Sequence, residues 1–165
     1  MLPLIRLLSL AVLIVPAPLH ADTDVTTTYY IDSREGSDLN TGRSAAAAWK
    51  SHTKAQHTKL LPGDVVMFKR GSQFSGPIHL TQSGTPAQPI VLTAYGEGPA
   101  PKFTNPDDRN MNGNCIRISG SHVIIERLHF HDTPPTRHSN RVKSIFQMGA
   151  VVNMHGARHN IIRHT

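Results

Sequence analysis

Cysteine is almost absent from this chain of 165 residues, in which Cys115 is the only one. A single thiol cannot form an internal disulfide, and it excludes a cysteine-rich zinc module. Aromatic residues make up only 5% and charged residues only 17%, but hydrophobic residues reach 38%, which excludes wholesale disorder. Because helix-favouring runs are few and there are 12 glycines and 12 prolines, the composition favours one β-rich, turn-rich domain.

Long hydrophobic runs are also missing. The longest, residues 7–15, follows Arg6, is ended by proline, and precedes a small residue, Ala21. This run is too short to span a bilayer, and the arrangement is typical of a secretory signal peptide. We therefore expect residues 1–21 to be a signal peptide and residues 22–28 a polar leader. The protein is expected to be secreted or periplasmic, with no stable membrane anchor.

Charge is divided unevenly along the chain. Residues 22–108 carry 8 basic and 9 acidic side chains (net −1), whereas residues 109–165 carry 8 basic and 2 acidic ones (net +6). An exported protein rarely meets its own genome, so no nucleic acid partner is expected. The basic half instead favours an acidic polysaccharide as partner. The same residues would equally serve to keep outward faces soluble. Nothing in the sequence indicates an oligomeric state.

Short β-branched and aromatic segments alternate with glycine, proline and serine clusters, which is the pattern of short strands. The expected strands are residues 28–31, 65–68, 77–80 and 89–95. Residues 45–61 begin with four consecutive alanines and are the one stretch that predicts a helix, ended by Pro62 and Gly63.

Residues 115–127 and 151–163 read as one unit written twice. Each has a strand, a glycine turn, a histidine, paired isoleucines and a basic residue, offset by 36 to 37 positions. Residues 132–144, between them, are polar and broken by proline, which predicts a loop insertion. The repeat predicts two neighbouring coils of a solenoid, with the copied strands side by side in parallel register. Strand alternation places Ile116 and Ile118 inside and Arg117 outside.

Several spaced motifs occur in the order found at the start of exported right-handed parallel β-helix proteins. They are residues 29–32, 36–42, 49–50, 61–71 and 89–96. Over residues 29–165 the chain thus resembles the N-terminal portion of the pectate-lyase-like superfamily. The resemblance implies an all-β fold, a right-handed parallel β-helix with a short N-terminal capping helix over residues 45–61. Because solenoids need several coils and a closing cap, we expect a C-terminally truncated domain that holds only the cap and first coils.

The resemblance also implies a carbohydrate site on one outer face, beside the 132–144 loop. A uronate lyase needs a cation near the carboxylate and a base that takes the C5 proton. The candidate catalytic residues are Arg137, His138, Arg141 and Lys143. The candidate substrate-binding residues are Asn153 and His155. We therefore expect the full-length protein to bind, and to cleave by β-elimination, an acidic (uronate) polysaccharide.

Two alternatives remain. A glycoside hydrolase needs paired carboxylates, but Glu126 and Asp132 are the only acidic residues after Asp108. A non-catalytic cell-envelope or adhesion β-helix protein would bind polyanionic glycans through the same basic face. An assay for unsaturated products separates lyase from binding protein.

Metal sites are not indicated. His129 and His131 share one strand face and would need His155 or His159 to complete a zinc site, so solvated imidazoles are the simpler interpretation. The loop that begins at Asp108 fails as a calcium-binding EF-hand, because its twelfth position is a serine. Residues 38–40 offer oxygens for calcium, although an Asx turn explains them equally. No cofactor is expected, and calcium has no supporting motif. Cys115 is predicted to be a buried thiol, and Trp49 is predicted to seal the core.

Overall fold

The computed structural model describes residues 26–105, 115–131, 152–154 and 157–165. The elements in chain order are β1 (Thr28–Ile31), the 3-10 helix η1 (Ala45–Ala47), α1 (Thr53–His57), β2 (Val65–Lys69), β3 (Gln73–Ser75), β4 (Ile78–Leu80), β5 (Ile90–Tyr95), β6 (Lys102–Thr104), β7 (Ile116–Ile118), β8 (Val123–Glu126), β9 (His129–Phe130), β10 (Val152–Met154) and β11 (Ile161–Arg163). The described chain is therefore mostly strand. Neither described helix is longer than five residues, so neither is long enough to cross a bilayer.

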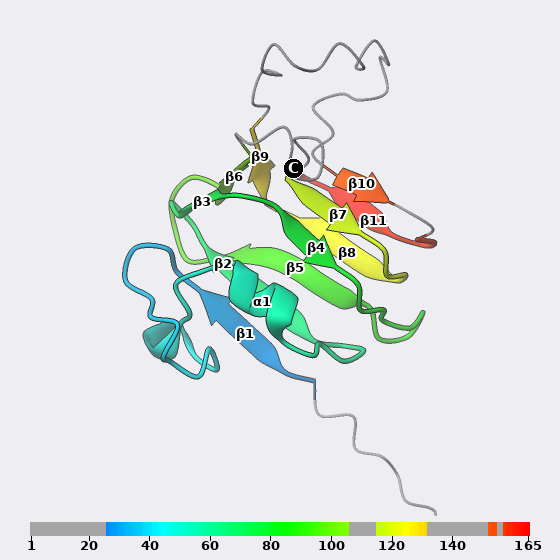
Figure 1. Ribbon diagram of the computed structural model, residues 1–165, viewed down its shortest axis with the longest axis horizontal. Coiled ribbons are helices and arrows are strands. Elements are labelled where there is room, and N and C mark those ends of the chain that lie inside the picture. The colour runs from blue at the N-terminus through cyan, green and yellow to red at the C-terminus, as the bar shows by residue number, and fades with distance from the viewer. Residues whose placement is uncertain (1–25, 106–114, 132–151, 155–156) are drawn as a thin grey trace, which may run out of the picture.

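The strands form three parallel sheets, ordered β1-β2-β5-β8-β11, β10-β7-β4 and β3-β6-β9. Figure 1 shows the strands of the five-stranded sheet side by side, from blue β1 to red β11. From β2 onward, successive strands enter the five-stranded sheet, the β3-β6-β9 sheet and the β10-β7-β4 sheet in constant rotation. The all-β prediction is thus confirmed, and it rests on pairing between segments far apart in the chain.

The predicted register between the two copied units is confirmed. In β10 and β7, Val152 pairs with Ile116 and Met154 pairs with Ile118. In β11 and β8, Ile161 pairs with Ile124. Equivalent residues of the repeat therefore lie on adjacent parallel strands, because each copy needs its neighbour to complete its backbone hydrogen bonds.

The core contains a cluster of phenylalanines contributed by different strands. The ring centroids of Phe68 and Phe103 are 5.1 Å apart, and those of Phe74 and Phe103 are 4.9 Å apart. Phe103 is fully buried, and Phe130 packs against it at 5.4 Å. Strand alternation places these rings inside, because every second residue of a strand faces the same side. The predicted inward positions Ile116 and Ile118 are likewise buried, and so is Leu128.

The single helix predicted over residues 45–61 is wrong in its extent. The chain forms η1 and α1 with an extended break at Trp49, whose backbone bridges Ile31. Trp49 N–H donates to the Tyr30 carbonyl at 2.9 Å, and the Asp32 N–H donates to the Trp49 carbonyl at 2.8 Å. The sheet edge therefore overrides the helical preference of the alanines. Trp49 is buried and stacks on Tyr29 at 5.0 Å, so its predicted sealing role is confirmed.

The short helix α1 covers the free edge of β4. The Gln56 side-chain carbonyl accepts the His79 N–H at 3.0 Å, and the Gln82 side chain donates to the Thr58 carbonyl at 3.2 Å. An uncovered strand edge exposes unpaired N–H and C=O groups that recruit other chains. The helix thus protects that edge, although it is only five residues long.

Candidate functional site

The sequence-predicted site falls largely outside the described residues. Those outside are Arg137, His138, Arg141, Lys143 and His155. Asn153 is described as part of β10, where it pairs with Arg117 of β7. Arg117 in turn pairs with His79 of β4. Arg117 and His79 therefore lie next to Asn153, a predicted substrate-binding residue, at one register position across the sheet.

This register position on sheet β10-β7-β4 offers polar groups above a buried apolar layer. Ile116 and Ile118, on either side of Arg117, are both 0% exposed. His79 is half-buried, and its Nε2 lies 3.1 Å from Ser119 Oγ. Arg117 Nε is buried, and among the described residues it has no hydrogen-bond partner. A buried guanidinium N–H without a partner can donate to a ligand oxygen at little further desolvation cost. Sequence reasoning missed His79 because only the pairing of β4 with β7 connects it to this face.

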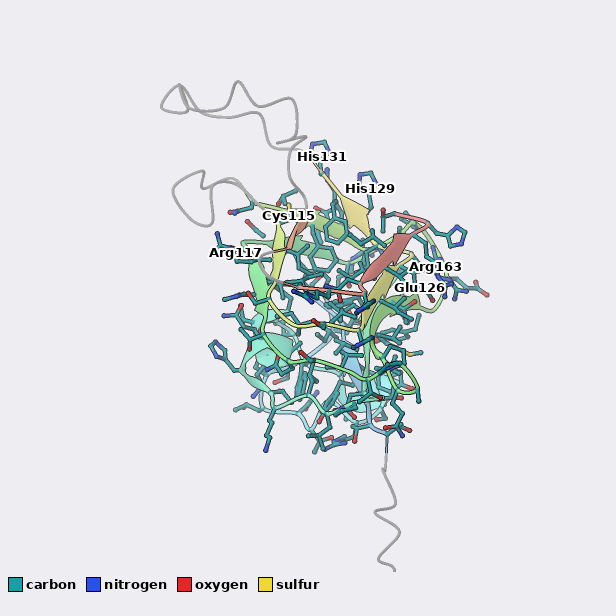
Figure 2. All side chains as sticks on the ribbon, turned by 90° about the vertical axis from the view of Figure 1, so that its right-hand side faces the viewer. Cys115, Arg117, Glu126, His129, His131 and Arg163 are labelled. Carbon is teal, nitrogen blue, oxygen red and sulfur yellow. The ribbon has the colours of Figure 1, made fainter. Side chains whose placement is uncertain are left out.

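Glu126 is the only acidic residue described beyond residue 105, and it is held in an ion pair. Arg163 Nε lies 2.7 Å from Glu126 Oε2, and Thr93 Oγ1 donates to Glu126 Oε1 at 3.3 Å. The hydrogen bond from Arg163 holds the pKa of Glu126 below its usual value. Figure 2 shows Glu126 and Arg163 together, on the opposite side of the view from Arg117. A general acid in glycoside hydrolysis needs a raised pKa, so Glu126 is unsuited to that role.

Asp64 and Asp32 also accept hydrogen bonds from the backbone. Asp64 accepts from the N–H groups of Thr27 at 2.8 Å and Leu61 at 2.9 Å. Asp32 accepts from the Arg34 N–H at 2.9 Å. A carboxylate that accepts backbone N–H groups organises a loop, which explains these acids without a catalytic role.

Asp38 organises the loop that the sequence offered for calcium. It accepts from the N–H groups of Lys50 at 3.0 Å and Ser51 at 2.9 Å. Burial raises the pKa of Asp38, but the hydrogen bonds from Ser51 and Lys50 outweigh it and hold the pKa below its usual value. Asn40 donates its side-chain N–H to the Ala48 carbonyl at 3.0 Å. These contacts favour the turn interpretation over a calcium site.

His129 and His131 share a strand face, as predicted, with ring centroids 6.3 Å apart. Both are exposed, and Figure 2 shows them projecting beyond β9. His159 stacks instead on His122, at 5.0 Å. Within the described part of the chain, no three metal-binding side chains come together. His155 lies outside it.

Cys115 is 2% exposed, in agreement with its prediction as a buried thiol. Its Sγ lies 3.7 Å from the Phe103 carbonyl oxygen and 3.9 Å from that of His131. Nucleophilic cysteines are exposed and lie in electropositive surroundings. The buried Cys115 thiol is therefore a structural residue of the core.

Comparison with known proteins found no family model that matches the chain. The chain is 40% identical over 79 residues to a lacto-N-biosidase of Bifidobacterium longum, a stretch that is 46% of this chain and 5% of that protein. It is also similar to crystal structures, native and selenomethionine, of the GH136 lacto-N-biosidase from Eubacterium ramulus. The TM-score is 0.55 and the identity 27%, over 63% of this chain and 20% of that one. The chain thus spans a small fraction of each relative.

These relatives correct the family assignment. Both are lacto-N-biosidases, and the Eubacterium ramulus enzyme belongs to glycoside hydrolase family GH136, so the resemblance to the pectate-lyase-like superfamily is wrong as an identification. The sequence motifs on which that resemblance was based form strands, turns and the N-terminal edge of the sheet. Residues 29–32 include most of β1, and residues 65–69 are β2. Such motifs report how a chain folds and say little of its chemistry.

The relatives also correct the predicted function. Neither β-elimination of a uronate polysaccharide nor the polyanion-binding alternative is supported, because the relatives are named for hydrolysis of lacto-N-biosides. The excess of basic residues misled the prediction. Arg163 pairs with Glu126, Arg70 donates to the Gly98 carbonyl at 3.1 Å, and Arg43 lies over the Tyr29 ring at 4.6 Å. Several basic residues therefore serve local structure, and the net charge does not identify a substrate.

Proposed function

We propose that this chain is the N-terminal part of an exported glycoside hydrolase that acts on oligosaccharides as lacto-N-biosidases do. The observation that carries the proposal is the 40% identity over 79 residues to the Bifidobacterium longum enzyme. The match to the Eubacterium ramulus structures supports it independently, through the fold. Export follows from the signal-like residues 1–21.

For the fold, the proposal is a right-handed parallel β-helix over residues 29–165, with α1 and η1 near its N-terminal end. Support comes from the constant rotation of successive strands among three parallel sheets. Crossovers between parallel strands of one sheet are right-handed in about 98% of cases, which gives the direction of winding. In such a solenoid each coil shelters its apolar side on the next one.

Catalytic carboxylates belong elsewhere in the proposed enzyme. Among the described acids, Glu126 is ion-paired, and Asp32, Asp38 and Asp64 accept backbone N–H groups. Hydrolysis needs two carboxyl groups with separated pKa values around the scissile bond. The chain covers only 20% of the solved enzyme, which leaves ample sequence for them.

The 132–144 loop keeps a proposed role in this enzyme, as a source of hydrogen-bond donors to sugar hydroxyls. Arginine, lysine and histidine donate such bonds to neutral sugars as well as to acidic ones. Asn153, beside Arg117 in the strand register, belongs to the same proposed surface.

The test is to express the locus, with any in-frame continuation, and to follow nitrophenol release from p-nitrophenyl β-lacto-N-bioside. Release from this substrate, but not from p-nitrophenyl N-acetyl-β-glucosaminide, is expected for an enzyme that removes a disaccharide. No release from the disaccharide glycoside would refute the proposal. The 165-residue chain alone is the matched control and is expected to be inactive, because it covers only 20% of the solved enzyme and Glu126, Asp32, Asp38 and Asp64 are already engaged.

A further inference from the structure

A cavity of about 360 Å³ opens on the outer side of sheet β3-β6-β9. It belongs neither to the predicted site nor to the face that carries Arg117. Besides the buried Ser72, three polar residues line it, one from each strand of the sheet: Gln73 from β3, Lys102 from β6 and His129 from β9. Ligand pockets in proteins begin at about 300 Å³, so the cavity has room for a small ligand.

The three polar residues occupy one register position across the sheet. Gln73 pairs with Lys102, and Lys102 pairs with His129. The neighbouring Phe74, Phe103 and Phe130 face the core, which directs the polar row outward. Strands in a sheet lie about 4.8 Å apart, so the row extends about 10 Å along the surface. Such a row can contact a ligand longer than one sugar ring.

None of these three side chains forms a hydrogen bond or ion pair within the part of the chain that the structure describes. Gln73 and His129 are exposed, and Lys102 is half-buried. An amide, an ammonium and an imidazole together provide donors and acceptors at fixed spacing. They are therefore available to a ligand without first breaking an internal hydrogen bond or ion pair.

The backbone around the cavity argues against a multiply charged anion as the preferred ligand. Anion sites are built from free backbone N–H groups, but here these groups are already donating. Gly71 N–H bonds to the Pro99 carbonyl at 2.8 Å, and Lys102 N–H bonds to the Ser72 carbonyl at 2.9 Å. His129 N–H bonds to the carbonyl of Pro101 at 2.9 Å. Only one permanent cation, Lys102, lines the cavity.

Pro99 and Ala100 add an apolar floor beside the polar row. A sugar ring matches this combination, because its C–H face packs on apolar side chains while its hydroxyls exchange hydrogen bonds at the edge. Mixed apolar surfaces with a few convergent polar groups are characteristic of ligand sites.

We propose that this cavity is a glycan subsite for a short neutral oligosaccharide. The ring packs on Pro99 and Ala100, and its hydroxyls bond to Gln73, Lys102 and His129. The proposal deepens the proposed function and rests on it only for the choice of sugar.

The experiment is calorimetric titration of the 165-residue chain with lacto-N-biose. Gln73→Ala and His129→Ala are each expected to weaken binding at least about 10-fold, since each removes a hydrogen-bonding group from the ligand. Both side chains are exposed, so thermal melts should show little change in stability. Ser75→Ala is the matched control, because Ser75 is exposed on the same sheet but does not line the cavity; its affinity should equal that of the unaltered chain.

Three results would overturn the subsite. They are no saturable binding up to about 10 mM disaccharide, an affinity of both cavity variants equal to that of the unaltered chain, or displacement of the sugar by inorganic sulfate. The nitrophenol assay reports on the proposed function separately. Binding without hydrolysis leaves the subsite standing and refutes the enzyme, whereas hydrolysis without binding by this chain refutes the subsite alone.

Discussion

Replacing His52 with phenylalanine is expected to make the protein less sensitive to mild acid. His52 is 6% exposed, and its ring lies edge-on to Phe74 at 5.6 Å and to Phe103 at 6.3 Å. Its Nε2 is buried without a hydrogen-bond partner among the described residues. Burial lowers the pKa of His52 below its usual 6.5, although the backbone of Pro77 and Gly76 acts in the opposite direction.

The direction of the effect follows from where the proton binds. The unfolded chain takes up a proton at His52 near pH 6.5, whereas the folded chain keeps the ring neutral to lower pH. The unfolded state therefore binds more protons, and the free energy of unfolding falls as the pH drops below that value. For one such group the slope is at most about 1.4 kcal/mol per pH unit.

Phenylalanine cannot take up this proton, so that part of the slope should disappear. The substitution also removes a buried nitrogen without a partner, and such groups cost about 1–3 kcal/mol. The variant is therefore expected to be at least as stable as the unaltered chain near neutral pH, and increasingly more stable than it toward about pH 5.

Urea unfolding at a series of pH values measures this difference, with the free energy extrapolated to water. His57→Gln, at an exposed histidine of α1, is the control and should leave the slope unchanged. Equal slopes for His52→Phe and the unaltered chain would show that His52 takes up its proton to the same extent in the folded and unfolded states, which refutes the argument from burial.

Three other substitutions test the core, the ion pair and a close backbone approach. Phe103→Ala should cost about 3–5 kcal/mol in urea unfolding and Phe130→Ala distinctly less, since only Phe103 is fully buried; equal costs would contradict the packing described. Glu126→Gln should cost about 0.2–1 kcal/mol at neutral pH, and the difference should vanish as the pH falls through the lowered pKa of this carboxyl; a cost that persists in acid would not come from its charge. Gly120→Ala should cost about 1–3 kcal/mol, because a Cβ there would overlap the Gln82 carbonyl; an unchanged melting temperature would show that the turn can move.

The sequence was informative wherever two segments of similar pattern pair. Residues 115–127 and 151–163 share a glycine turn and paired isoleucines, and their strands do lie in parallel register. Such pairing can be predicted because each copy buries the same face and needs the same neighbour.

The ends of the helices within residues 45–61 could not be predicted from the local sequence. Four alanines favour a helix locally, but the backbone at Trp49 is extended because it pairs with Ile31, 18 positions earlier in the chain. Tertiary contacts routinely override such local preference.

The polar row that lines the cavity could not be predicted from the sequence for a related reason. Gln73, Lys102 and His129 each precede a core phenylalanine, but a pattern of two residues is too short to reveal the pairing, so only the strand register brings them together. The substrate could not be predicted from net charge, because basic residues such as Arg163 form contacts within the fold.

The distance along the chain between paired residues of the five-stranded sheet is not constant. It is 37 positions from Thr28 to Val65 and 26 from Val65 to Val91. From Ile90 to Val123 it is 33 positions. The pairing survives these changes because extra residues leave the ladder at the bends, and lengthening a surface connection costs little entropy. Insertions and deletions at these bends are therefore the cheapest route by which such proteins can diversify what they recognise while the stacked strands stay as they are.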